Sequence, residues 1–169
     1  MDKKVAQLLN EQVNKEFYSA YLYLDIANYY TDQNLDGFAN WYNVQAQEER
    51  DHAMLMMQYL QNNSEKVTLE AVAKPDATYN NAGDPLNVAA NHERYVTGLI
   101  NTIYDAAYSV KDFRAMQFLD WFVKEQGEEE KNADTLVKKY ALYGDDPKSL
   151  YLLDQELATR TYAAPTLVL

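Results

Sequence analysis

The 169-residue sequence contains no cysteine, only four prolines and only five glycines. Without cysteine the chain has no disulfide, no thiolate metal site and no iron–sulfur cluster. The scarcity of proline and glycine favours long, uninterrupted helices. Residues 1–12 lack a basic segment followed by an apolar run, and no stretch approaches 18 consecutive apolar residues. We therefore expect a soluble, cytoplasmic protein without a signal peptide or a membrane span.

Basic residues are also scarce. The 15 lysines and arginines face 26 aspartates and glutamates, which gives a formal net charge of −11. This balance disfavours nucleic acid and anionic membranes as partners and favours the attraction of cations, although solubility alone would explain it equally well. Tyrosine is abundant, with 15 residues, and most of these side chains should pack in the core or at interfaces.

Four long segments each carry a stripe of inward-facing residues at alternating four- and three-residue steps. This is the period of a helix that faces a partner helix. The first stripe comprises Leu9, Val13, Glu16, Ala20, Tyr23, Ala27 and Tyr30. The second comprises Phe38, Tyr42, Gln45, Glu49, His52, Met56 and Tyr59. The third comprises Leu86, Ala89, Glu93, Val96, Ile100, Ile103, Ala107 and Val110. The fourth comprises Ala115, Leu119, Phe122, Gln126, Glu129, Ala133, Leu136 and Tyr140.

Each stripe holds a glutamate, and none holds a lysine or an arginine. The four glutamates are Glu16, Glu49, Glu93 and Glu129. Burial of an unpaired charge costs several kcal/mol per ion, so these side chains need protons, basic partners or metal ions. The stripes supply no basic partner. Two divalent cations would balance the four carboxylates, with His52 and Gln126 as neutral ligands, and the stripes therefore predict a dinuclear metal site in the core.

Local signals place the first two helices. Asp2 is a suitable cap for a helix that runs to about Thr31. Residues 32–36 form a short polar connection, so the next helix, from about Asp36 to Asn63, should return antiparallel to the first.

The next stretch, residues 64–84, has no helical period. A loop this long is uncommon inside a compact domain and needs a reason. About 21 extended residues reach about 70 Å, whereas a 27-residue helix is roughly 40 Å long. The loop can therefore cross the whole bundle and start the third helix parallel to the second, which is the single-crossover topology.

Pro85 marks the start of the third helix, which runs to about Lys111. The stripe then slips by five residues, and Asp112 is the candidate cap of a fourth helix that ends at Gly144. Asp146 and Pro147 begin a short fifth helix. We divide the chain into a bundle domain, residues 1–145, and the short fifth helix with its tail, residues 146–169, of which the part from 161 to 169 has no readable structure.

The inward-facing polar residues follow a known pattern of bundle metal sites. That pattern takes one glutamate from each of two helices and a Glu-x-x-His from each of the other two. Residues three apart lie on one helix face, so both can reach one site. The residues that fit are the single glutamates Glu16 and Glu93, the pair Glu49 and His52, and the variant pair Gln126 and Glu129. One such pair is a weak signal, whereas contributions from four helices at matched depth are a strong one.

These motifs resemble those of the bacterial non-haem ferritins. The resemblance spans residues 5–157 and is carried by NEQVNKEFYSAYLY (10–23), AQEERDH (46–52), NHERY (91–95), FLDWFVKEQGEEEK (118–131) and LYLLDQEL (150–157). It implies an all-α, ferritin-like four-helix bundle with one long crossover and a short fifth helix, assembled as a hollow shell of 24 subunits. Members of that family oxidise Fe(II) with O2 or hydrogen peroxide at the dinuclear site and store the ferric mineral inside.

Carried over position by position, the resemblance implies three iron sites. The first takes Glu16, Glu49 and His52. The second takes Glu49 as a bridge, together with Glu93, Gln126 and Glu129. The third, of the bacterial type, takes Glu48, Glu125, Glu128 and Glu129. Tyr23, which the resemblance makes part of the catalytic site, and Trp121 match an aromatic pair beside the centre.

Two positions depart from the family or distinguish its branches. Gly127 lies inside the fourth helix, where glycine costs about 1 kcal/mol relative to alanine, and we expect it to loosen that helix. Arg50 stands where the haem-containing bacterioferritins place a methionine haem ligand, so we expect iron and no haem. Leu150, Leu153 and Leu157 share one face of the fifth helix, which can pack internally or, as the resemblance implies, make assembly contacts.

Two other functions compete with iron oxidation and storage. One is a di-iron peroxidase or oxidase of the rubrerythrin kind, although the absence of cysteine removes the usual rubredoxin module. The other is a non-catalytic, metal-binding helical bundle. Rapid consumption of O2 on addition of Fe(II) would distinguish this last function from a ferroxidase.

Overall fold

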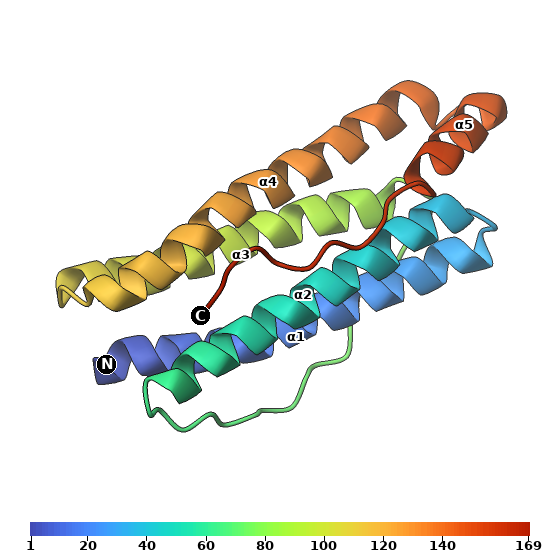
Figure 1. Cartoon of the computed structure of the whole chain (residues 1–169). Coiled ribbons are helices and arrows are strands. Elements are labelled where there is room, and N and C mark those ends of the chain that lie inside the picture. Colours follow the sequence, from blue (N-terminus) through green and yellow to red (C-terminus); the bar gives the residue numbers. More distant parts are fainter.

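The computed structural model describes all residues, 1–169, and contains five α-helices and no strand (Figure 1). The helices are α1 (Lys3–Asp32), α2 (Asp36–Asn62), α3 (Asp84–Ser109), α4 (Phe113–Tyr143) and α5 (Pro147–Leu157). The first four form a four-helix bundle, with α1 antiparallel beside α2 and α3 antiparallel beside α4, while α5 lies at one end (Figure 1). The predicted fold class is confirmed. None of the helices has both the length and the apolar character that crossing a bilayer requires.

The helix ends follow the local signals in the sequence. Asp2 accepts hydrogen bonds from the first turn of α1, and Asp112 and Asp146 do the same for α4 and α5. Between α3 and α4 the chain turns through Lys111, which has a φ of 59°. Because α3 ends at Ser109, Val110 falls in this turn with 47% of its surface exposed, and its predicted core position is wrong.

The long connection, residues 63–83, runs along the α1–α2 pair and starts α3 parallel to α2, as predicted (Figure 1). It has no regular secondary structure, so α1 side chains pair with it instead. Asn10 both donates to the carbonyl oxygen of Thr68 at 3.0 Å and accepts from its N–H at 2.8 Å. The Tyr79 hydroxyl donates to Asp25 Oδ2 at 3.1 Å. These bonds hold the crossover on the bundle surface.

The core consists of two apolar clusters with a polar layer between them. One cluster contains Val5, Leu9, Met56, Ile100, Phe118 and Leu119, among others. The other contains Ile26, Tyr30, Phe38, Leu86, Leu136 and Leu153, among others. The predicted stripes run through both clusters, although Ala133 and Tyr140 are only half-buried. The glutamates of the stripes all fall in the layer between the clusters.

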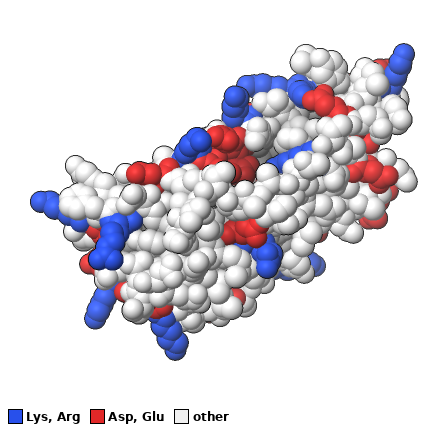
Figure 2. Space-filling model, viewed as in Figure 1, with Lys and Arg blue, Asp and Glu red and all other residues white.

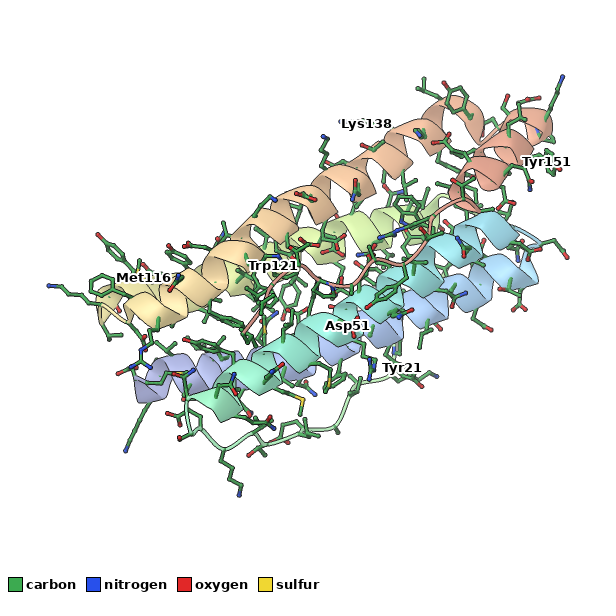
Figure 3. The ribbon with its side chains drawn as sticks, viewed as in Figure 1. Tyr21, Asp51, Met116, Trp121, Lys138 and Tyr151 are labelled. Carbon is green, nitrogen blue, oxygen red and sulfur yellow. The ribbon has the colours of Figure 1, made fainter.

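The leucine face of α5 packs internally. Leu153 and Leu157 are 4% and 1% exposed, and Leu150 packs against the same cluster as a half-buried residue. The apolar side chains that α5 exposes are instead Tyr151 and Leu152, at 60% and 59%. Figure 3 shows Tyr151 on the outer side of α5. Of the two interpretations of the leucine face, internal packing is therefore the correct one within a subunit.

Asp154 of α5 caps α2 from a distance in sequence. The N-cap position of α2 is Leu35, which offers no side-chain hydrogen bond. The Oδ1 atom of Asp154 takes over that role and accepts from the N–H groups of Gly37 and Phe38 at 2.8 and 3.0 Å. A Cβ on Gly37 would lie 1.7 Å from the carbonyl oxygen of Asp154, so only glycine permits this approach. A carboxylate at a helix N-terminus is also favoured by the helix dipole.

We expect Asp154→Ala to lower the free energy of unfolding by about 1–3 kcal/mol, because it leaves two N–H groups of α2 without an acceptor in a buried setting. Asp154→Asn keeps one side-chain oxygen and should lose less. Thermal unfolding followed by circular dichroism measures the effect, with the exposed Asp145→Ala as control. An Asp154→Ala protein that melts with the control would contradict this account of how α5 is joined to α2.

Candidate metal centre

The polar layer of the bundle holds all six predicted ligands of the dinuclear site. Each of the four long helices contributes at least one of them. Their exposed fractions are 1% for Glu16, 2% for Glu49, 2% for His52, 3% for Glu93, 4% for Gln126 and 5% for Glu129. Side chains predicted from the helical period alone therefore meet at one depth of the core.

The structure places two groups of candidate metal ligands together. Glu16, Glu49 and His52 offer ligand atoms that all lie within 4.8 Å of one another. A second group of the same compactness consists of His52, Glu125 and Glu129. The imidazole is common to both, and its Nδ1 atom lies 3.4 Å from Glu49 Oε2. The residues predicted for the first iron site thus lie together, whereas Glu129 is grouped with Glu125 rather than with the other residues predicted for the second site.

The carboxylate of Glu93 is held by neutral donors. The Tyr23 hydroxyl donates to its Oε1 atom, and Gln126 Nε2 donates to its Oε2 atom at 3.2 Å. Burial and the nearby carboxylates raise the pKa of Tyr23 well above its usual value, so the phenol keeps its proton. Tyr23 was predicted beside the centre and Gln126 within it. Both side chains fix the orientation of Glu93.

Two further glutamines support the layer and were not identified as site residues from the sequence. Gln12 Nε2 donates to Glu16 Oε1 at 2.9 Å. Gln45 Nε2 donates to Glu129 Oε2 at 2.7 Å and to Glu49 Oε1 at 3.4 Å. Each glutamine lies four residues before a glutamate of its own stripe or helix face, and this spacing could have identified both.

The environment of this layer disfavours the ionised form of its carboxylates. Burial raises the pKa of Glu16, Glu49 and Glu129 well above the usual value, and repulsion from neighbouring buried glutamates adds to it. The pKa of Glu93 is raised by burial as well. Glu16 Oε2 is buried and has no hydrogen-bond partner. Oxygen donors with one imidazole, and one oxygen left without a partner, suit a divalent cation such as Fe(II).

The residues of the third predicted site are less closely assembled. Glu125 reaches the second ligand group, as described above. Glu48 Oε2 instead lies 2.5 Å from Nη2 of Arg160, and Glu128, with 61% of its side chain exposed, lies 3.6 Å from Lys124 Nζ. Gly127 lies within the continuous helix α4, and a Cβ there would meet open space. Figure 2 shows acidic side chains gathered near the middle of this face of the molecule.

Aromatic rings cover one side of the imidazole. His52 meets Trp121 and Phe122 edge-on, with ring centroids 5.5 and 5.8 Å away. Trp121 therefore contacts a predicted ligand, whereas Tyr23 contacts the centre through Glu93. Of the two aromatic residues predicted beside the centre, Trp121 thus contacts His52 and Tyr23 contacts Glu93.

Comparisons with known proteins agree with this arrangement. The model of the ferritin-like domain matches residues 6–142. A bacterial non-haem ferritin of Campylobacter jejuni is 37% identical over 92% of this chain and 93% of its own length. One from Staphylococcus epidermidis is 33% identical, over 96% of this chain and 98% of its own.

Solved ferritin structures have the same fold as this chain. The open-pore ferritin of the hyperthermophilic archaeon Archaeoglobus fulgidus superposes with a TM-score of 0.93 at 40% identity, over 95% of this chain and 99% of that one. A closed form of that ferritin, engineered by site-directed mutagenesis, superposes with a TM-score of 0.94 at 39% identity, over 96% and 99%. The chain therefore belongs to the family of the bacterial non-haem ferritins, which is built on the ferritin-like domain.

Proposed function

We propose that the protein is a ferroxidase and an iron-storage protein. Fe(II) is the substrate, two ions bind per subunit in the polar layer, and the ferric product is stored as mineral inside a hollow shell of 24 subunits. The observation that carries this proposal is the set of four buried glutamates without any lysine or arginine among them. Membership of the ferritin family supports it. Arg50, at the position of the methionine haem ligand in bacterioferritins, supports iron without haem.

Glu49 has the central role in the proposed reaction. It is grouped with Glu16 and His52, and in the proposed arrangement it also bridges to the second iron. Glu93, Gln126 and Glu129 complete that second site. Hard oxygen ligands stabilise Fe(III) more than Fe(II), so the donor set favours oxidation of the bound ions. Two Fe(II) ions lose one electron each, and with two protons these reduce O2 to hydrogen peroxide, or hydrogen peroxide to two water molecules.

Tyr23 and Gln126 prepare Glu93 for this role. Both donate hydrogen bonds to its carboxylate, which fixes where its oxygens lie before a cation arrives. Such partners typically affect metal affinity or activity by about ten- to a hundredfold. Tyr23 therefore acts next to the irons, through a ligand of the second one.

We expect Glu49→Ala to abolish rapid Fe(II) oxidation, because the change removes a ligand from both irons. Loss of several kcal/mol of stabilisation corresponds to a rate decrease of about a hundredfold or more. Stopped-flow absorbance of the ferric product and O2 consumption measure the initial rate. Glu11→Ala removes the same charge from an exposed position on α1 and is the control. Normal initial oxidation in Glu49→Ala would refute the dinuclear assignment. Iron binding without O2 consumption in the unsubstituted protein would favour a non-catalytic bundle.

We further propose that Glu48, Glu125, Glu128 and Glu129 form a weaker third iron site that tunes turnover. Because Glu48 is paired with Arg160, the test leaves that residue unchanged and uses the double variant Glu125→Gln/Glu128→Gln. The first oxidation of two irons per subunit should proceed within about twofold of the normal rate, since the ligands of the first two sites remain. The ratio of iron oxidised to O2 consumed, or later mineralisation, should change. Loss of the first rapid phase would place Glu125 in the primary site.

The assembly has a direct test. A shell of 24 copies of the 19.5 kDa chain has a mass of about 470 kDa (24 times 19.5). Exposed apolar residues at the α5 end, including Tyr151 and Leu152, offer surface for contacts between subunits. We expect size-exclusion chromatography with light scattering to give that mass. A stable monomer or dimer at micromolar concentration would contradict the shell while leaving the metal centre unaffected.

A further inference from the structure

The C-terminal segment, residues 158–169, returns along the bundle instead of leaving it (Figure 1). The Tyr162 hydroxyl donates to Asp51 Oδ2 on α2 at 2.5 Å. Trp121 Nε1 on α4 donates to Thr166 Oγ1 at 3.0 Å, and Leu167 packs against an apolar core cluster. In Figure 3, Asp51 and Trp121 lie on the two helices that border the segment. The segment therefore covers the side of the metal centre that α2 and α4 form.

Arg160, at the start of this segment, is the one basic residue inserted toward the centre. Its side chain is only 15% exposed, and its guanidinium lies over the ring of Trp41 at 4.1 Å. Asn40 Nδ2 donates to the Arg160 carbonyl oxygen at 3.0 Å, which fixes the backbone. Nη2 pairs with Glu48 Oε2 at 2.5 Å. Stacking, ion pair and backbone bond together give this guanidinium one orientation.

The other side of the guanidinium contacts the support of the metal centre. Nη1 donates to Gln45 Oε1 at 2.8 Å. Since an amide has its acceptor and its donors at opposite ends, this bond directs Nε2 of Gln45 toward the ligands. That nitrogen donates to Glu129 Oε2 at 2.7 Å and to Glu49 Oε1 at 3.4 Å. A continuous path of hydrogen bonds thus joins Arg160 to two proposed iron ligands on different helices.

We propose that Arg160 is a positioning residue of the dinuclear centre and acts through Gln45. This inference rests on the proposed ferroxidase function. Arg160 orients Gln45, and Gln45 holds Glu129 and Glu49 at the separation that a pair of cations requires. The neutral amide has a second effect, because it keeps the guanidinium off the ligands of the dinuclear centre. A direct Arg–carboxylate bond would neutralise a charge that the cations need, whereas Gln45 transmits orientation without neutralisation.

The test measures metal binding as well as activity. Co(II) titrations, followed by the visible absorption of the bound ion, give the affinity of the centre without any oxidation. Arg160→Ala should weaken Co(II) binding and slow initial Fe(II) oxidation by about ten- to a hundredfold, as is typical of residues that orient metal ligands. Arg160→Lys keeps the charge and can keep the Glu48 pair, but it lacks the fork that also reaches Gln45, so it should restore the function only in part.

Two comparisons separate positioning from charge and from packing. Arg50→Ala removes the same charge next to Glu49, but from a side chain that is 61% exposed and paired with Asp51, so it should leave both readouts near normal. If Arg160 acts through Gln45, the double variant Arg160→Ala/Gln45→Ala should be no worse than Gln45→Ala alone. The variants are compared as assembled shells, and if Arg160→Ala does not assemble, Arg160→Lys takes its place in the same cycle.

Normal Co(II) affinity in Arg160→Ala, an effect no larger than that of Arg50→Ala, or full additivity with Gln45→Ala would each overturn the inference. Failure of the proposed function gives a different result. A protein that binds Co(II) in the centre but does not oxidise Fe(II) would refute the ferroxidase, and the Co(II) affinities of the variants would still test Arg160.

Discussion

The structure depends on the burial of four carboxylates in the middle of a helical bundle. Desolvation of an ionised carboxylate costs several kcal/mol, and no stripe holds a lysine or an arginine to offset it. The fold concentrates this cost in one layer, because all four lie at one depth with an apolar cluster on either side. The clusters hold the helices at fixed separations, so the oxygens face one another and not solvent. What the layer lacks is positive charge, which the proposed substrate supplies.

Neutral amides hold this layer in place before any cation arrives. Gln12, Gln45 and Gln126 each donate to a buried glutamate. A lysine or arginine in their place would bind the carboxylate more strongly, but it would also cancel the charge that attracts iron. The only guanidinium near the centre, that of Arg160, reaches Gln45 and Glu48. Orientation and charge are therefore controlled by different residues.

The sequence predicted what depends on the helical period and missed what joins distant segments. Glu16, Glu49, Glu93 and Glu129 were found because their stripes repeat locally, and the helix ends because Asp2, Asp112 and Asp146 are local caps. Val110 was misplaced because the period alone does not show where a helix ends. The Asp154 cap on α2 and the contact of Arg160 with Gln45 join residues more than 100 positions apart, and no periodicity reports such a pair. The leucine face of α5 fitted either packing or assembly, and only tertiary contacts decided between them.

The two halves of the centre differ in a way that suits iron as a passing substrate. Glu16 precedes Glu49, and Glu93 precedes Gln126, by the same 33 positions (49 − 16 and 126 − 93), so the α1–α2 and α3–α4 pairs correspond. In the first pair the ligand atoms already lie together around His52, and Glu16 Oε2 has no partner. In the second pair Gln126 replaces a carboxylate, and Glu93 is bound by Tyr23 and Gln126. The second side thus offers carboxylates and an amide where the first has a histidine, so in the proposed function the two sides bind iron with unequal affinity, as suits an ion that passes through.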